Sequence, residues 1–183
     1  MKNGVFIFVG KSGCGKGTQA DLLREYFKKT FGEAPFFSLE TGQKFRELAK
    51  QSNYTSQLAK KVNDAGGLQP EFLCVSFWGA LFIEKMGAET ALFIDGSPRK
   101  LYEAYILDGA LEFYERKDIY VIYLDTTAEE ATTRLLKRGR VDDTPSGIAQ
   151  RLRWYETDVV PSINFFRENP RYKFLNINGQ QEV

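Results

Sequence analysis

The fold of this chain is decided near its N-terminus, by Val5-Phe6-Ile7-Phe8-Val9-Gly10-Lys11-Ser12-Gly13-Cys14-Gly15-Lys16-Gly17-Thr18. The five apolar residues at its start predict a strand that is buried on both faces of a sheet. Apolar residues recur at helical spacing from Gln19 to Phe27, which predicts a helix directly after the glycines. Backbone N–H groups of a glycine-rich turn, together with a helix N-terminus, bind phosphate groups. This stretch therefore predicts a phosphate-binding loop between a buried strand and a helix.

Lys16 is the residue of this loop that can reach the outer phosphates of a nucleotide. The strict loop pattern has Ser or Thr directly after the lysine, whereas here Gly17 precedes Thr18, so Thr18 is a candidate magnesium ligand displaced by one position. The alternative is a glycine-rich turn that binds nothing, but it does not explain the order of strand, loop, lysine and helix. We expect Cys14 to be present for its small size rather than for redox chemistry. The expected ATP-binding residues here are Gly10, Ser12, Gly13, Cys14, Gly15, Lys16, Gly17 and Thr18.

Predicted strands and helices alternate along the rest of the chain. Further strands are expected at residues 35–39, 91–94, 119–124 and 172–177. A long helix is expected to start at Thr144 and Pro145 and to bend at Pro161. The alternation implies an α/β fold, in which a parallel sheet has helices on both faces and binds ligands at the carboxyl ends of its strands. The other helices are expected over residues 42–50, 56–64, 70–84, 100–115 and 129–137, and the apolar stripe of the long helix is Ile148, Leu152, Tyr155 and Val159.

Length and composition exclude several classes of function. The 183 residues fit one domain, and 43% hydrophobic with 27% charged residues predicts a globular one. The net charge of +1 creates no field that would attract nucleic acid or a membrane, so we expect neither as a partner. The chain has no histidine, which removes Ser-His-Asp and Cys-His catalysis and most zinc sites. The two cysteines, and apolar runs too short for a signal peptide or a membrane span, predict a cytoplasmic protein.

The motifs of the chain, taken in order, resemble those of adenylate kinases and related nucleoside monophosphate kinases nearly from end to end. The stretch Gly15-Lys16-Gly17-Thr18-Gln19-Ala20 is similar to the phosphate loop of that family. Each of the later motifs alone is a weak indicator of the family, but all of them in the same order are a highly specific one. They are Thr41-Gly42-Gln43-Lys44-Phe45-Arg46, Asp64-Ala65-Gly66-Gly67-Leu68-Gln69-Pro70, Asp95-Gly96-Ser97-Pro98-Arg99, and the lid residues Arg134, Arg138, Arg140, Asp142, Asp143 and Arg151.

The resemblance implies a kinase that transfers the γ-phosphoryl group of ATP to a nucleoside monophosphate, with AMP as the expected acceptor. It implies a P-loop NTPase-type sheet of about five strands in the order 2-3-1-4-5. We expect one domain over residues 1–183, with a monophosphate-binding segment at 41–71 and a short lid at 138–143. The implied cofactor is Mg²⁺ with ATP, held through water by Asp95, whose alternative role is to form a turn with Gly96. We expect no zinc, and a monomer whose partners are ATP and the monophosphate.

The resemblance also implies roles for individual residues, and the chemistry of the transfer agrees with them. Phosphoryl transfer depends on positioning and on neutralising phosphate charge, and guanidinium groups suit both tasks. For Arg134 and Arg138, four residues apart, the alternative is a solvated helix face, and Asp142 with Asp143 is implied to latch the lid by pairing with arginines. The implied catalytic residues are Lys16, Arg99, Arg134, Arg138, Arg140 and Arg151, with Arg134 and Arg138 also contacting ATP. The implied monophosphate-binding residues are Thr41, Gly42, Arg46, Gly67, Gln69, Gly96, Arg99, Glu103, Arg140 and Arg151.

The chain departs from the family pattern in four ways. Gln43 replaces the aspartate that follows Thr-Gly, so a carboxylate near the metal is missing. The lid is too short for a zinc site and is expected to exclude water less completely. The sequence stops soon after its last predicted strand, where relatives usually continue into a terminal helix, so either that helix is missing or another cover is expected there. Glu103 stands where adenylate kinases have a glutamine that reads the adenine of AMP.

The base preference of the acceptor site is left open by Glu103. A carboxylate accepts hydrogen bonds only, so it suits the N1 and N2 donors of guanine better than the edge of adenine. Alternatively, Glu103 points to solvent or pairs with Lys100, and the backbone near Gln69 reads adenine alone. The resemblance makes Thr41 an indicator of a purine acceptor.

Two other functions compete with the monophosphate kinase. A nucleotide-dependent switch or ATPase of the same fold would need fewer phosphate-binding arginines than this chain has. A P-loop kinase for another small acceptor, such as a sugar, would not need the segments from Thr41 to Arg46 and from Gly66 to Gln69.

Overall fold

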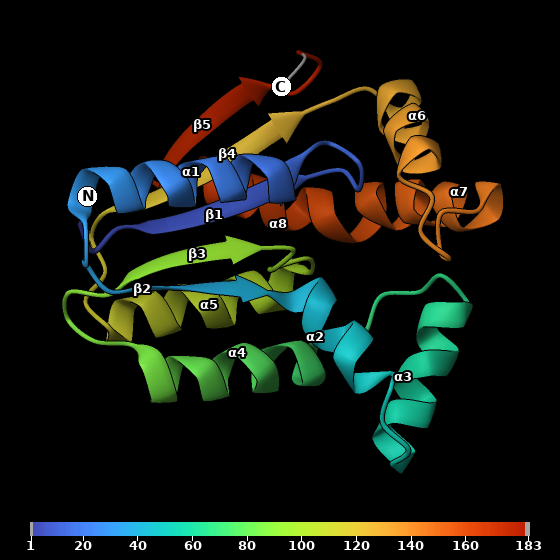
Figure 1. Cartoon of the computed structure of the whole chain (residues 1–183), viewed down its shortest axis with the longest axis horizontal. Coiled ribbons are helices and arrows are strands. Elements are labelled where there is room, and N and C mark those ends of the chain that lie inside the picture. The colour runs from blue at the N-terminus through green and yellow to red at the C-terminus, as the bar shows by residue number, and fades with distance from the viewer. Residues whose placement is uncertain (1, 182–183) are drawn as a thin grey trace.

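The computed structural model of this chain describes residues 2–181, and its centre is a five-stranded parallel sheet (Figure 1). The strands follow the order β2-β3-β1-β4-β5, which confirms the predicted order 2-3-1-4-5. Every neighbouring pair is parallel. The strands are β1 (Val5–Gly10), β2 (Phe36–Glu40), β3 (Ala91–Asp95), β4 (Ile119–Asp125) and β5 (Lys173–Asn178).

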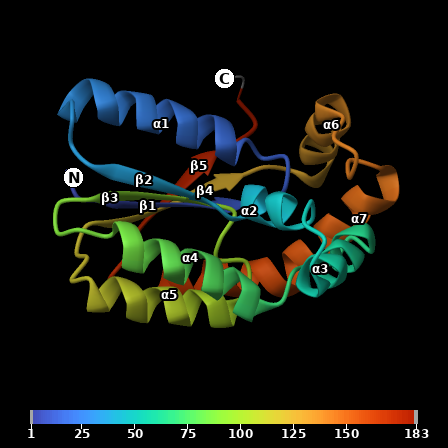
Figure 2. The same cartoon turned by 60° about the horizontal axis from the view of Figure 1, so that its bottom comes forward.

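The two faces of β1 belong to two separate hydrophobic clusters. Phe6 and Phe8 point to the face covered by α1 (Lys16–Phe31), where they pack with Ala20 and Phe27. The alternate residues of β1, including Ile7, point to the other face and pack with α4 (Glu71–Lys85), α5 (Leu101–Phe113) and α8 (Val160–Glu168). Figures 1 and 2 show α1 on one side of the sheet and α4 and α5 on the other. Successive side chains of a strand alternate in direction, so a strand buried on both faces has to be apolar throughout.

The expected monophosphate-binding segment forms two helices that project from the sheet (Figure 2). They are α2 (Thr41–Leu48) and α3 (Tyr54–Asp64), and α3 is capped by the Asn53 side chain, which accepts a hydrogen bond from the Ser56 N–H at 2.9 Å. A small separate core, made of Phe45, Leu48, Ala59 and Cys74, joins both helices to α4. This segment therefore has packing of its own and meets the main core through α4.

The chain between β4 and β5 holds α6 (Ala128–Arg138), the lid loop and a long interrupted helix. Gly139 ends α6 in the left-handed conformation, at φ 65°, and α7 (Pro145–Trp154) starts after Thr144, whose side chain caps it as predicted. The predicted bend at Pro161 takes the form of a π-helical turn (Tyr155–Val159) directly before α8, in which the Val160 N–H donates to the Tyr155 carbonyl five residues earlier. Proline has no N–H group, so an ordinary ladder could not continue through residue 161.

No helix within residues 2–181 is both long enough and apolar enough to cross a membrane.

Candidate active site

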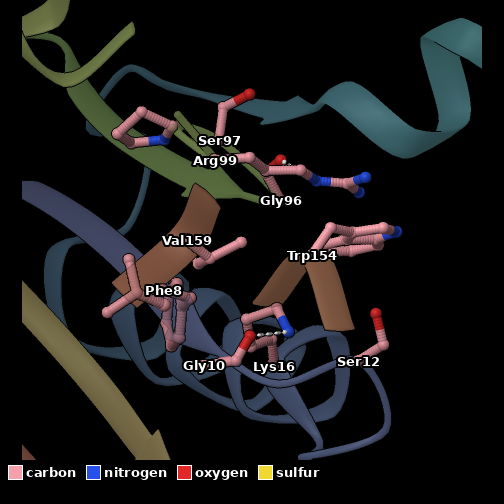
Figure 3. Close-up of a pocket in the computed structure, with 11 residues that line it drawn as sticks. Phe8, Gly10, Ser12, Lys16, Gly96, Ser97, Arg99, Trp154 and Val159 are labelled. Atoms are coloured by element: carbon pink, nitrogen blue, oxygen red, sulfur yellow. Dashed lines mark hydrogen bonds between the residues drawn. The ribbon is translucent and has the colours of Figure 1, made fainter. Parts of the chain in front are cut away.

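The loop predicted to bind phosphate joins β1 to α1. At two of its positions, Gly10 and Gly13, only glycine fits. Gly10 has φ 140° and Gly13 has φ 89°, and a Cβ atom at either position would lie within 2.6 Å of a backbone carbonyl oxygen. Lys16 lies at the start of α1, and its Nζ donates to the Gly10 carbonyl oxygen at 3.0 Å (Figure 3). It also donates to the Lys11 carbonyl oxygen at 2.8 Å. A Cβ at Gly10 would also come within 2.9 Å of Cys14 Sγ, which is consistent with a small residue being required at position 14. The loop has the backbone of a phosphate cradle.

Asp95 is placed as expected for a carboxylate that holds nucleotide-bound magnesium. It is the last residue of β3, and a Cβ placed on Gly17 would be 3.6 Å from Asp95 Oδ2, so the carboxylate faces the first turn of α1. Over residues 2–181 there is no group of three or more acidic, Cys or His side chains that could hold a metal alone. Magnesium that arrives with a nucleotide needs only one or two protein carboxylates, because phosphates and water fill its other positions. The residues fit Mg²⁺ with ATP, since Asp95 faces the first turn of α1, which contains Thr18.

Three arginines from different elements gather on the side of the site opposite the loop. Arg99 follows β3, and its Nε donates to the Gly96 carbonyl oxygen at 3.0 Å. Arg46 of α2 and Arg99 both approach Gly42, since a Cβ there would lie 3.3 Å from Arg46 Nη1 and 3.8 Å from Arg99 Nη2. The pKa of Arg140 is lowered by burial first, and then by the positive charges of Arg138 and Arg46. Within the described residues the guanidinium groups of Arg46 and Arg140 form no salt bridge, although the charges of Asp142 and Asp143 act on Arg140. Both groups therefore keep N–H donors for an anion.

The two aspartates of the lid pair with arginines, as the sequence predicted. Asp143, whose side chain is fully buried, accepts from Arg138 at 2.9 and 2.8 Å, from Arg151 at 2.8 Å and from the Arg140 N–H at 3.0 Å. Burial opposes ionisation of this carboxyl, but the hydrogen bonds outweigh it and hold its pKa well below the usual range. Asp142 pairs with Arg151 at 3.3 Å and is exposed. Asp143 is therefore the centre of the lid, and Asp142 adds one surface contact.

Arg134 lies apart from this lid cluster. Its Nε donates to Glu130 Oε1 at 2.8 Å, and its Nη1 donates to the Gly179 carbonyl oxygen at 2.8 Å, directly after β5. The residue is thus held against the loop that follows β5 rather than left on a solvated helix face. Its predicted contact with ATP stays a prediction.

Glu103 is the centre of a buried polar cluster, and this excludes two of the alternatives considered for it. Its side chain is 2% exposed, so it does not point to solvent, and Lys100 pairs instead with Glu71 at 3.1 Å. Glu103 Oε2 accepts a hydrogen bond from the Arg99 N–H at 2.9 Å. Burial raises the pKa of Glu103 and, with help from the Glu103 charge, raises the pKa of the Cys74 thiol to about 12.

The same cluster reaches the start of α2 through two residues that the sequence reasoning did not single out, Cys74 and Ser97. Cys74 Sγ is 3.6 Å from Ser97 Oγ, which in turn is 2.6 Å from Thr41 Oγ1. In the sequence, the one indication of this cluster is that the polar Ser97 stands in Asp95-Gly96-Ser97-Pro98-Arg99 where the family motif has phenylalanine. Gln69 is also buried and donates to the Ala59 carbonyl oxygen and to Asn63 Oδ1, both at 2.7 Å. The amide of Gln69 thus holds α3, and Gly67 continues this turn by donating to the Val62 carbonyl oxygen at 2.9 Å.

A pocket connects the phosphate loop to the arginine side of the site (Figure 3). Lys16 and Ser12 lie on one side of it and Arg99 with Gly96 on the other, and the Trp154 indole lies between Lys16 and Arg99. Trp154 is a further residue of the site to which the sequence analysis assigned no role. The pocket has the phosphate loop with Lys16 at one end and the Arg99 guanidinium at the other. A parallel sheet in this strand order with such a site defines a P-loop phosphotransferase.

Comparison with known proteins identifies the family. A family model described as adenylate kinase matches residues 8–171. Adenylate kinase 1 of Nostoc sp. is 34% identical over 175 residues, covering 96% of this chain and 90% of that protein. The adenylate kinases of Oenococcus oeni and Leptospira biflexa are each 32% identical, over 178 and 180 residues, and at least 96% of this chain is covered in both alignments. The chain belongs to the adenylate kinase family, and it is a phosphotransferase enzyme.

Proposed function

We propose that this enzyme transfers the γ-phosphoryl group of ATP to AMP and forms two molecules of ADP. The observation that carries the proposal is Arg99, which lines one pocket together with Lys16 of the phosphate loop. Arg46 approaches the same Gly42 as Arg99, and its charge acts on Arg140. An ATPase that transfers phosphate to water has no need for a second cationic site. Two anion-binding sites at one pocket suit a donor and an acceptor nucleotide.

The donor half is proposed to consist of the loop from Gly10 to Thr18 with Lys16. In the structure Lys16 donates to two carbonyl oxygens of its own loop, and an ammonium group has three protons that can be redirected to phosphate oxygens. Backbone N–H groups of the loop and the N-terminus of α1 add positive potential at the same place. Mg²⁺ bound with ATP would neutralise phosphate charge and would be held beside Asp95 and Thr18.

The lid is proposed to add arginines to the transferring phosphate. Asp143 engages two N–H groups of Arg138, and a guanidinium group has five, so Arg138 can hold a phosphate oxygen at the same time. Asp143 in this role fixes the directions of Arg138 and Arg151. Arg140 is proposed to link the two halves, because the charges of Arg138 of the lid and Arg46 of the acceptor side both act on it. Arg134 is proposed to contact the donor nucleotide from the edge of the lid.

The acceptor half is proposed to use Thr41, Gly42, Arg46, Gly67, Gln69, Gly96, Arg99 and Glu103, with Arg140 and Arg151 contributing from the lid. A second acceptor, GMP, is favoured by one specific observation, the buried carboxylate of Glu103 in the polar cluster of this half. A carboxylate can accept from both N1 and N2 of guanine. The proposal treats residues 1–183 as one domain that acts as a cytoplasmic monomer, with residues 41–71 and 138–143 as its moving parts.

A coupled assay with ATP and each of AMP, GMP, CMP and UMP tests this function. We expect purine monophosphates to be converted to diphosphates, with AMP the best acceptor, and no turnover without an acceptor. ADP formation that does not depend on any monophosphate would show an ATPase instead. Phosphorylation of a non-nucleotide acceptor in preference to all four would overturn the assignment of the acceptor half.

A further inference from the structure

We propose that Trp154 is a positioning residue for the acceptor monophosphate. Its indole ring holds the Arg99 guanidinium in place, and its N–H ties the monophosphate-binding segment to the body of the protein. This inference rests on the proposed function, because it concerns how the acceptor half of that site is held together.

The cation–π contact and the hydrogen bond of Trp154 both lie on the acceptor side of the pocket. The Arg99 guanidinium carbon is 5.5 Å from the centre of the indole ring, within the range of a cation–π interaction. The indole Nε1 donates to the Gly66 carbonyl oxygen at 3.1 Å. Trp154 is 9% exposed, so both contacts are shielded from water and are stronger than they would be on the surface. One side chain thus touches the cationic group and the segment that together form the acceptor half.

The hydrogen bond to Gly66 can fix the position of the monophosphate-binding segment, residues 41–71. Gly66 lies in the turn between α3 and α4 at φ 69°, and a Cβ there would lie 3.1 Å from the Gln150 side chain of α7. A hydrogen bond at this turn joins residues 88 positions apart and fixes one end of the segment against α7. Arg99 is also anchored by its Nε bond to Gly96. With the ring beside it, the guanidinium has two supports and keeps N–H groups for phosphate.

Trp154 and the residue that follows it serve different halves of the site. Tyr155 is also buried, but it contacts the donor half: the Lys11 Nζ lies 4.4 Å from the centre of its ring, and its hydroxyl is 3.3 Å from that of Tyr123. Two consecutive aromatic residues thus face the two halves of the site at the start of the π-helical turn. Turns of this kind are frequent at functional sites.

Steady-state kinetics of Trp154→Phe and Trp154→Leu test the proposal, since phenylalanine keeps a ring beside Arg99 but has no N–H, and leucine keeps neither. We expect Trp154→Leu to raise the KM for AMP about tenfold or more, a change of about 1.4 kcal/mol, while the KM for ATP stays within about twofold. Trp154→Phe should fall between wild type and leucine. Trp78→Phe is the matched control, because Trp78 is the other tryptophan, lies in the core and should leave both KM values unchanged.

A double-mutant cycle separates support of Arg99 from a general loss of packing. In an Arg99→Ala background, the difference between the Phe and Leu variants in the KM for AMP should disappear, because the ring has no guanidinium left to hold. An undiminished difference in that background, or equal changes in the KM values for ATP and AMP, would overturn the proposal.

A binding readout keeps the inference testable if Trp154→Leu does not fold. In Trp78→Phe protein, Trp154 is the only tryptophan, so its fluorescence should change on titration with AMP and follow AMP binding. AMP binding without any fluorescence change would contradict the inference. A wild-type enzyme that neither binds nor phosphorylates AMP would instead refute the proposed function, so the two failures can be told apart.

Discussion

The backbone N–H of Arg99 donates a hydrogen bond to Glu103 Oε2 at 2.9 Å. The carboxylate thereby fixes the turn that presents the Arg99 guanidinium, and it does so from a buried position next to Cys74. A neutral glutamine could accept the same hydrogen bond through its amide oxygen. What glutamate adds at this position is therefore charge, and its two consequences can be measured separately.

The first consequence concerns the acceptor base. In Glu103→Gln, the amide can donate to N1 of adenine and accept from N6, whereas a carboxylate only accepts. We expect this variant to raise the AMP-to-GMP ratio of kcat/KM by about tenfold, since a mismatched base edge costs about 1–3 kcal/mol. Parallel assays with both monophosphates measure the ratio. An unchanged ratio would show that Glu103 does not read the base and acts only through Arg99.

The second consequence concerns stability. Burial raises the folded-state pKa of Glu103 above its unfolded value, so its contribution to stability is present in full at low pH and is lost as the pH rises through the folded-state pKa. Glu103→Gln removes this titration. We expect the variant to be more stable than wild type at pH 7, with a difference that shrinks towards pH 4. Urea unfolding of both proteins across this range measures it, and a difference that is constant with pH would count against a buried charged carboxylate.

Asp143 should show the opposite dependence on pH. Its folded-state pKa is lowered, so its contribution is present above the unfolded pKa and is lost as the pH falls towards the folded-state value. At pH 7 we expect Asp143→Asn to cost about 2 kcal/mol, because it weakens three charge-assisted contacts around one buried group. Asp142→Asn is the matched control, because that residue is exposed and should cost less than about 0.5 kcal/mol. Thermal or urea unfolding that ranks Asp142 above Asp143 would contradict this account of the lid.

Lys16→Met tests the phosphate loop. The Lys16 side chain bonds only to carbonyl oxygens of its own loop and to the Cys14 sulfur among the described residues, so the variant should fold. Removing a preorganised charge beside the transferring phosphoryl group is expected to lower kcat by about 10²–10³-fold or more. Circular dichroism checks the fold, and the coupled assay measures the rate. A folded variant with wild-type turnover would exclude Lys16 from the reaction.

The separate roles proposed for Arg99 and Arg140 predict separate kinetic defects. Arg99 lies on the acceptor side beside Gly96 and Trp154, so Arg99→Ala should chiefly raise the KM for AMP. The charges of both Arg46 and Arg138 act on Arg140, which belongs to the lid, so Arg140→Ala should chiefly lower kcat. Each change is expected to be about 10²-fold, the lower end for loss of a group that stabilises phosphate charge. The reverse pattern of KM and kcat changes would mean that the two roles are exchanged.

The sequence was sufficient for the sheet and the phosphate loop because their signals are local. A buried run such as Val5–Val9 reports its own environment on both faces, and the glycines and Lys16 mark the loop that follows. The alternation of such strands with helices then set the fold class, and the resemblance to a known family supplied the strand order. Helix boundaries differed by only a few residues, as for α1, which continues to Phe31.

The details of the acceptor half could not be predicted, because they depend on contacts between distant residues. Nothing near Glu103 in the sequence shows that Cys74 and Ser97 are its neighbours, or that Lys100 prefers Glu71. Trp154 is not part of the apolar stripe from Ile148 to Val159, and that stripe alone was enough to predict the helix. The spacing of apolar residues therefore indicated no function for Trp154. Its position depends on the π-helical turn, and a proline seven residues after Trp154 predicted a bend but not its form.

That π-helical turn also constrains how the chain can vary in length. A turn closed over five residues instead of four contains one residue more than an α-helix needs. Deleting a single residue there would restore a regular helix but rotate everything before it by about 100° relative to α8. The Trp154 ring would leave Arg99, and α7 would carry the lid arginines away from the loop. A one-residue deletion within Tyr155–Val159 is therefore a larger change than most substitutions in the site, although it removes no catalytic group.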